Sequence, residues 1–126
     1  MKKKILSKVK LFEEYHSKLR NLVGEIIEYY FSDNISDIQV QRSLYKLSHL
    51  CKNYITEVEM TIRITDFSKL KRQKLENAEL VESLKAIQKK FRNREDIREP
   101  LNDWLQLHIE QSGSKMISVL KTEMNN

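Results

Sequence analysis

Six polar side chains interrupt otherwise apolar helical stripes along the chain. They are two histidines, three amides and one carboxylate, namely His16, Asn53, Glu57, Gln73, Asn77 and His108. Mid-helix positions of neighbouring antiparallel helices lie at similar heights, so we expect these groups to meet in one layer of a core. Burying them unpaired would cost roughly 1–3 kcal/mol each. They must therefore satisfy one another, or be satisfied by water, a ligand or a metal ion.

The elements that carry these groups follow from apolar residues spaced alternately three and four apart, which is typical of amphipathic helices. We expect helices at about residues 5–31, 37–64, 68–92 and from Pro100 onward. Residues 32–37 have turn and cap chemistry, and Asp66 or Ser68 is a candidate N-cap. Gly113 would bend or end the last helix before it resumes.

The second helix carries two adjacent stripes. The one that contains the polar residues consists of Leu50, Asn53, Glu57, Met60 and Ile64. Beside it lie Leu47, Cys51, Tyr54 and Val58. Our prediction turns the first of these stripes towards the core.

Four such helices with short connections predict an all-α fold, a single antiparallel up-down-up-down four-helix bundle spanning residues 1–126. Two Gly and one Pro are too few for a sheet protein or a flexible linker. Without a run of about 18 apolar residues, no membrane span is expected, and without a signal-peptide pattern the expected location is the cytoplasm. Cys51, the only cysteine, excludes an internal disulfide and a Cys-based zinc finger.

The net charge of +5 is concentrated at one end of the sequence. A short basic N-terminal extension of about residues 1–10 holds Lys2, Lys3, Lys4, Lys8 and Lys10, and the remaining residues carry 18 charges of each sign. A solvated end that aids solubility is the simplest interpretation. No motif indicates a specific nucleic acid partner.

The polar segments resemble ligand motifs of the hemerythrin family. Residues 12–19, FEEYHSKL, are similar to the first-helix motif, with an acid three residues before a His that is followed by Lys and Leu. Residues 53–57, NYITE, resemble H-F-x-x-E, and residues 104–109, WLQLHI, resemble W-L-x-x-H-I. Gln73 and Asn77 align with the third-helix pair H-x-x-x-H. The resemblance spans about residues 12–113.

The resemblance implies a four-helix bundle that holds two irons, bridged by a Glu and an Asp, and binds oxygen reversibly. Three positions keep a residue of the ligand type: His16, Glu57 and His108. Four positions have lost theirs: Asn53, Gln73 and Asn77 replace His, and Gly113 replaces the bridging Asp. Amide oxygens are poor iron ligands beside imidazole, so we expect a degenerate diiron site without reversible oxygen binding.

Three interpretations of the polar centre remain open. In the first, the six polar groups form a metal-free hydrogen-bonded network. In the second, His16, Glu57 and His108 hold a single divalent metal, assisted by Asn53 or Gln73. In the third, the register differs and His49 contributes, because His49, Asn53 and Glu57 lie on one helical face.

The first interpretation leads to a non-enzymatic binding or regulatory module with no cofactor and a protein partner that the sequence does not identify. The alternative is a metal-binding protein whose residual iron site serves in oxygen or redox sensing. An enzyme with a mononuclear iron would need, in addition, an open coordination position and a substrate channel. The sequence favours neither a monomer nor a dimer.

Overall fold

The computed structural model describes residues 2–31 and 37–124, and the side chains of residues 5–31 and 37–122. The described residues form helices and no strand, which confirms the all-α prediction. Three long helices come first: α1 (Lys2–Tyr29), α2 (Asp37–Thr65) and α3 (Leu70–Arg92), the last preceded by the short turn η1 (Phe67–Lys69). A fourth helical run follows, made of α4 (Arg98–Trp104), η2 (Leu105–Gln111) and α5 (Ser112–Met124).

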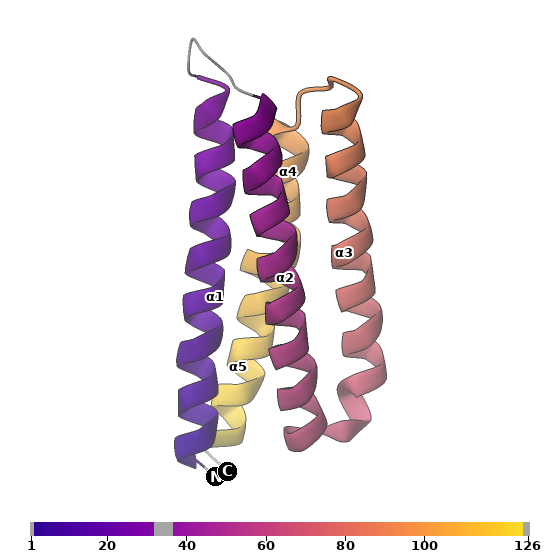
Figure 1. Cartoon of the computed structure of the whole chain (residues 1–126). Helices are drawn as coiled ribbons and strands as arrows, with labels where there is room; N and C mark the ends of the chain where they lie inside the picture. Colours follow the sequence, from indigo (N-terminus) through magenta and orange to yellow (C-terminus); the bar gives the residue numbers. More distant parts are fainter. Residues whose placement is uncertain (1, 32–36, 125–126) are drawn as a thin grey trace.

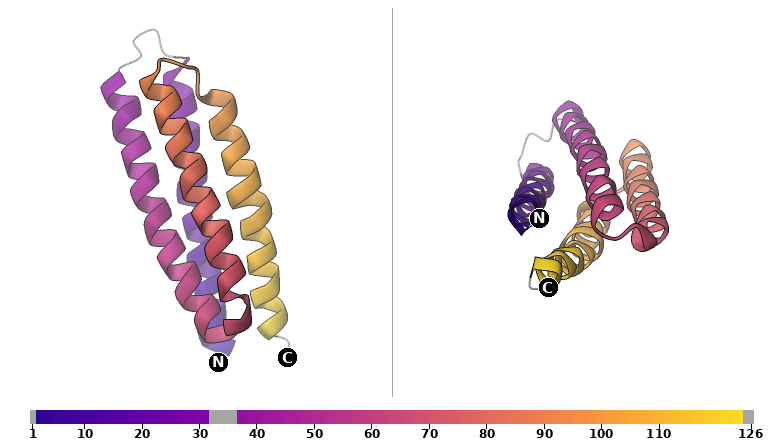
Figure 2. Two further views of the ribbon diagram at one scale, coloured as in Figure 1. Left: turned by 90° about the vertical axis from the view of Figure 1, so that its right-hand side faces the viewer. Right: turned by 90° about the horizontal axis from the view of Figure 1, so that it is seen from below.

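The four helical runs lie side by side, and consecutive runs are joined at alternating ends (Figure 1). α1 packs against α2 and against the fourth run, and α3 packs against α2 and α4. α1 and α3 lie diagonally opposite each other (Figure 2). The two ends of the chain and the α2–α3 connection lie at the same end of the molecule (Figure 1).

The core face of α2 differs from the predicted one. Its buried stripe runs at steps of three and four through Val40, Leu44, Leu47, Cys51, Tyr54, Val58 and Ile62. On the stripe expected inside, Asn53 is exposed, and the side chains of Met60 and Ile64 are 51% and 74% exposed. The buried stripe is apolar along the whole helix, so burying it removes more apolar surface from water than the interrupted stripe would. The prediction was therefore wrong by a rotation of about one residue.

Residues 2–10 do not form an extension separate from the helices. They are the first turns of α1, where Ile5 and Val9 are buried in the core. The predicted turn at residues 32–36 lies outside the described residues. Neither Asp66 nor Ser68 caps a helix with its side chain; the Ser68 hydroxyl donates to the Asp66 carboxylate instead.

The fourth run is irregular before Gly113 rather than at it. Residues 105–111 form a π-helical segment, and the chain continues through Gly113 as regular α-helix. The Ser112 hydroxyl donates to the Leu107 carbonyl at 3.1 Å, five residues back, and so satisfies an acceptor in the widened turn. Trp104 ties the run to α3, because its indole N–H donates to the Leu80 carbonyl at 3.1 Å. The π segment carries His108, and such segments recur at functional sites.

The register of α2 can be tested with two leucines. Leu47 is fully buried, whereas Leu75 on α3 is 66% exposed. We expect L47A to lower the free energy of unfolding by about 2–5 kcal/mol, since it removes core packing and leaves a cavity. L75A should change it by less than about 0.5 kcal/mol. Denaturant melts measure both values, and equal losses would contradict this placement of the core.

Candidate functional site

The centre of the molecule is a buried hydrogen bond between α1 and α2. The His16 Nε2 and the Tyr54 hydroxyl lie 2.8 Å apart, and the two side chains are only 7% and 4% exposed. Their rings meet edge to face, and Phe12, one turn before His16, packs against Tyr54 in the same way. His16 lies on the buried stripe of α1, as the sequence predicts. Its partner was missed, although Tyr54 belongs to the stripe that lies beside the predicted one.

Gly113 makes room for the His16 ring. A Cβ added at Gly113 would lie 2.5 Å from His16 Cε1 and 2.6 Å from Nε2, closer than van der Waals contact allows. The ring cannot move away without disturbing its hydrogen bond to Tyr54. The absence of a side chain at Gly113, where the resemblance would have an Asp, therefore allows the His16 ring to lie where it does.

A second set of hydrogen bonds links α3 to α2. Gln73 donates to the Asn77 carbonyl oxygen at 3.0 Å, and the Asn77 amide donates to Glu59 at 3.0 Å. Asn77 is 5% exposed, so these bonds satisfy an amide that would otherwise be costly to bury. Glu59 was not predicted. No signal in the sequence distinguishes Glu59 from Glu57, since both adjoin the buried Val58.

A small cavity of about 20 Å³ lies where these groups meet, which is room for about one water molecule. Four of the predicted positions line it: Gln73, Asn77, His108 and Gly113. Tyr54, Glu76, Leu80, Ser112 and Met116 complete the lining. His16 contacts this wall through Tyr54 and Gly113. The structure thus brings together the predicted residues of helices α1, α3 and the fourth run.

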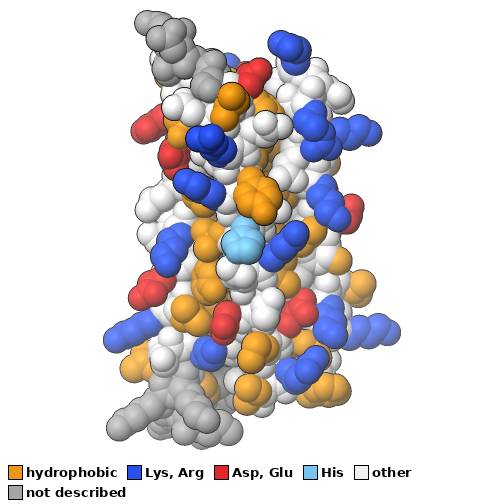
Figure 3. Space-filling model, viewed as in Figure 1, with side chains coloured by type: hydrophobic (Ala, Val, Ile, Leu, Met, Phe, Trp, Pro, Cys, Tyr) orange, Lys and Arg blue, Asp and Glu red, His pale blue; other side chains and the backbone are white. Residues whose placement is uncertain are grey.

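The predicted residues of α2 lie elsewhere. The Lys8 ammonium donates to the Glu57 carboxylate at 2.9 Å, in a half-exposed ion pair between α1 and α2. Asn53 is exposed, and so is His49, which excludes a contribution of His49 to the centre. Figure 3 shows the face of the molecule seen in Figure 1, where apolar and charged side chains are interspersed. The expected single layer of six polar groups is therefore wrong for Asn53 and Glu57.

These positions do not suit a metal centre. Within residues 2–31 and 37–124, no group of three or more His, Cys, Asp and Glu side chains is placed to hold an ion. The His16 Nε2 is bonded to Tyr54, and Glu57 is paired with Lys8. Two of the three residues of the predicted mononuclear site are thus engaged with other side chains. The residues fit neither a diiron centre nor the mononuclear site that the sequence left open.

Burial sets the protonation of the centre. Desolvation lowers the pKa of His16 below its ordinary value; Glu110 partly offsets this by raising it, and Arg20 lowers it further. These two side chains pair with each other at 2.7 Å and join α1 to η2. Desolvation also lowers the pKa of His108, partly offset by Glu79, and raises the pKa of Tyr54. A neutral imidazole is therefore hydrogen-bonded to a neutral phenol. This contact links α1 to α2 without placing a charge in the core.

The thiol of Cys51, the only cysteine in the sequence, is unreactive. Cys51 is buried in the stripe of α2, and desolvation raises its pKa to about 12. A thiol that stays protonated at neutral pH is neither a ready nucleophile nor a metal ligand.

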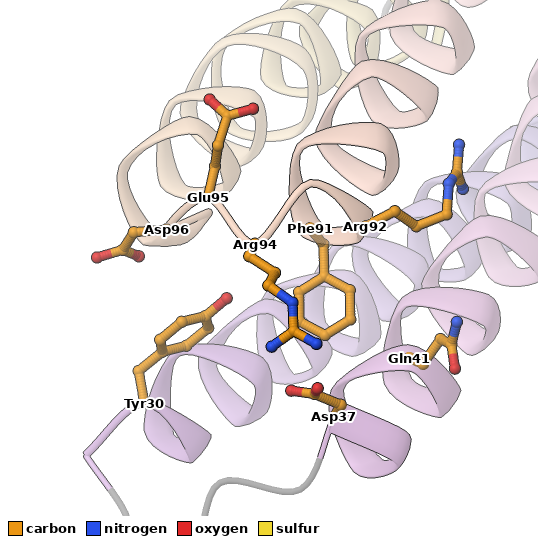
Figure 4. Close-up of a pocket in the computed structure, with 8 residues that line it drawn as sticks. All are labelled: Tyr30, Asp37, Gln41, Phe91, Arg92, Arg94, Glu95 and Asp96. Carbon is orange, nitrogen blue, oxygen red and sulfur yellow. The ribbon is translucent and has the colours of Figure 1, made fainter.

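A larger hollow of about 770 Å³ lies at the end of the molecule away from the α2–α3 connection. It is enclosed by the end of α1, the start of α2 and the α3–α4 connection. It is lined by Tyr30, Asp37, Gln41, Phe91, Arg92, Arg94, Glu95 and Asp96 (Figure 4). The Arg94 guanidinium extends between the two aromatic rings towards Asp37. Three acids and two arginines line this open surface, and none of the predicted site residues is among its lining residues.

Comparison with protein-family models, with curated proteins and with solved structures finds no match for this chain.

The close approach of Gly113 to the His16 ring predicts that replacing glycine by alanine has opposite effects on stability at Gly113 and at Gly24. G113A should lower the free energy of unfolding by about 1–3 kcal/mol, because the new methyl group must displace a packed ring. G24A is the matched control: Gly24 is also helical, and nothing lies within 4 Å of its added Cβ. It should raise the free energy of unfolding by about 0.5–1 kcal/mol. If G113A also stabilises, the His16 ring does not pack on this glycine.

The lowered pKa of His16 predicts a loss of stability in mild acid. The unfolded chain takes up a proton at about pH 6.5, whereas the folded chain does so only at lower pH. The contribution of His16 to the free energy of unfolding is therefore full above about pH 6.5. It falls as the pH drops from there towards the lower pKa of His16 in the folded chain. We expect the melting temperature to fall between pH 7.5 and pH 5.5, and to fall less in H16Q.

The exposed His49 supplies the control for this experiment. H49Q should keep the acid-dependent loss of the unmodified chain, measured by thermal melts in the same buffers. An identical pH dependence in H16Q and the unmodified chain would show that His16 titrates alike in the folded and unfolded states.

Proposed function

We propose that this chain is a non-enzymatic binding or regulatory module built on a hemerythrin-like, antiparallel up-down-up-down four-helix bundle. In this proposal hydrogen bonds between side chains have taken the place of a metal centre. The observation that carries it is the buried His16–Tyr54 pair, which is packed against Gly113. The Nε2 nitrogen of His16, one of the two ring nitrogens that could bind an ion, instead contacts a phenol.

The amides support the same proposal. Gln73 and Asn77, which stand where the resemblance would have histidines, form hydrogen bonds that end on Glu59. An amide both donates and accepts, so it can bridge neighbours without a metal. Among the described residues, no buried side-chain nitrogen or oxygen lacks a partner. Such a centre favours a rigid scaffold over a reactive site.

The size of the central cavity argues against catalysis there. About 20 Å³ holds one water molecule, whereas ligand pockets usually measure a few hundred Å³ or more. The centre therefore offers a substrate no room, and we assign the functional contacts to the outer surface. A role in binding another component follows from this assignment.

The alternative is a residual iron site that senses oxygen or redox state. It requires His16, Glu57 and His108 to bind one ion, at the expense of the His16–Tyr54 bond and the Lys8–Glu57 pair. The groups that line the cavity include only one imidazole, of His108, and one carboxylate, of Glu76, beside two amides, a phenol and a hydroxyl, which is a weak set for iron. The geometry therefore favours the metal-free module.

Metal analysis tests the proposal. The full chain, purified without chelator or nickel resin, should carry less than about a tenth of an equivalent of iron, manganese or zinc. Added Fe(II) should produce no new absorption and no rise in melting temperature, because an ion that binds only the folded state would stabilise it. About one equivalent of metal, lost in both H16A and H108A but retained in H49A, would overturn the proposal in favour of the sensor.

A further inference from the structure

We propose that the end of the molecule formed by the α2–α3 connection and the two ends of the chain docks on an anionic lipid bilayer. This inference names a partner for the binding module proposed above, and rests on that proposal only in assigning the chain a binding role. It is carried by two independent features of this end: its charge and its exposed apolar side chains.

Charge is strongly divided along the molecule. Three segments meet at this end: residues 2–10, 61–74 and 113–124 (Figure 1). Together they hold 12 Lys and Arg and only 2 acids, whereas the rest of the chain holds 11 Lys and Arg and 16 acids. The molecule is thus basic at one end and acidic over the remainder. Such a dipole orients a protein with its basic end towards a negative surface.

Large apolar side chains protrude among these cations. Ile64, in the last turn of α2, is 74% exposed, and Phe67, in the turn η1, is 70% exposed. Leu6 on α1 and Val119 on α5 are 45% and 37% exposed. Apolar and basic side chains lie together over the lower end in Figure 3. Single exposed apolar side chains also occur elsewhere, as at Phe31 and Tyr45, but at this end they lie within the basic segments, so that apolar and cationic contacts can act together.

The cations at the α2–α3 connection are held only weakly by acids. Lys69 lies 3.5 Å from Asp66, and Arg72 lies 3.6 Å from Glu76, with side chains that are 54% and 86% exposed. Exposed pairs at such distances contribute little to stability. Lys69 and Arg72 can therefore exchange these acids for lipid phosphates. Arg63 and Lys71 are exposed at the same connection and add to its positive charge.

The shape of this end favours a bilayer over other polyanions. Ile64 and Phe67 project from a turn between two helices, so they can enter the boundary between headgroups and acyl chains while the basic residues stay at the headgroups. A nucleic acid backbone would use the same cations but would gain little from Ile64 and Phe67. The combination of both kinds of side chain is what a lipid surface recognises.

Vesicle co-sedimentation of the full chain tests the proposal. The probes are vesicles of phosphatidylcholine alone and vesicles in which roughly 30% of the lipid is phosphatidylserine, whose negative surface attracts basic segments. We expect binding at least about tenfold tighter to the anionic vesicles, and its loss in 0.5 M salt, where the screening length is only a few Å. Equal binding to both vesicles, or to neither, would overturn the proposal.

Two pairs of variants locate the contact. I64S/F67S and K69E/R72E should each weaken binding to anionic vesicles about tenfold or more, because each removes one of the two kinds of contact. Phe31, at the other end of the molecule, is 75% exposed, so F31S and R92E are matched controls that should bind unchanged. All substituted side chains lie on exposed helix or turn surfaces, and circular dichroism checks that each variant folds. Equal losses in the controls would overturn the assignment.

A binding measurement with a duplex DNA of mixed sequence distinguishes a nucleic acid partner from a lipid bilayer. Binding to DNA as tight as to the anionic vesicles, and equally tight in I64S/F67S, would replace the bilayer by a nucleic acid and overturn the proposal. Failure of vesicle binding would leave the metal content of the protein unchanged. The two proposals can therefore fail separately.

Discussion

The structure depends on how one imidazole is buried. The His16 ring lies between the Tyr54 hydroxyl on α2 and the bare backbone of Gly113 on α5, so it joins three of the four helical runs at one point. Each of these neighbours is constrained by the others, because a side chain at Gly113 would displace the ring and the ring would then leave a buried phenol without a partner. A set of small, neutral contacts thus fixes the relative position of the helices.

Much of the fold follows from the sequence, because apolar spacing decides which segments are helical and four such segments must cover one another. The residues of α1, α3 and the fourth run that meet at the centre were predicted for the same reason. Helix α2 was not, because two adjacent stripes differ by a rotation of only about one residue, and the polar one matched a family motif. Neither could the sequence reveal the π-helical turn at 105–111 or the close approach at Gly113, since both arise from packing between distant segments.

The corrected register changes the chemistry that the molecule can support. With Asn53 and Glu57 turned away, the centre retains a neutral histidine, a phenol and two amides joined by hydrogen bonds. In our proposal, a hydrogen-bonded centre of this kind confers rigidity and the functional contacts lie on the outer surface. The uneven distribution of charge over that surface gives one end of the helical scaffold a distinct chemical character.

The most direct test of the account is the nitrogen NMR spectrum of the three imidazoles between about pH 5 and pH 8, recorded with and without added Zn(II) or Fe(II). The account predicts that His16 remains neutral to a lower pH than the ordinary imidazole pKa of about 6.5, and that its signals do not move when metal is added. A His16 that takes up its proton at about the ordinary imidazole pKa of 6.5, or whose nitrogens shift on metal addition, would contradict the buried His16–Tyr54 bond as the centre of the structure.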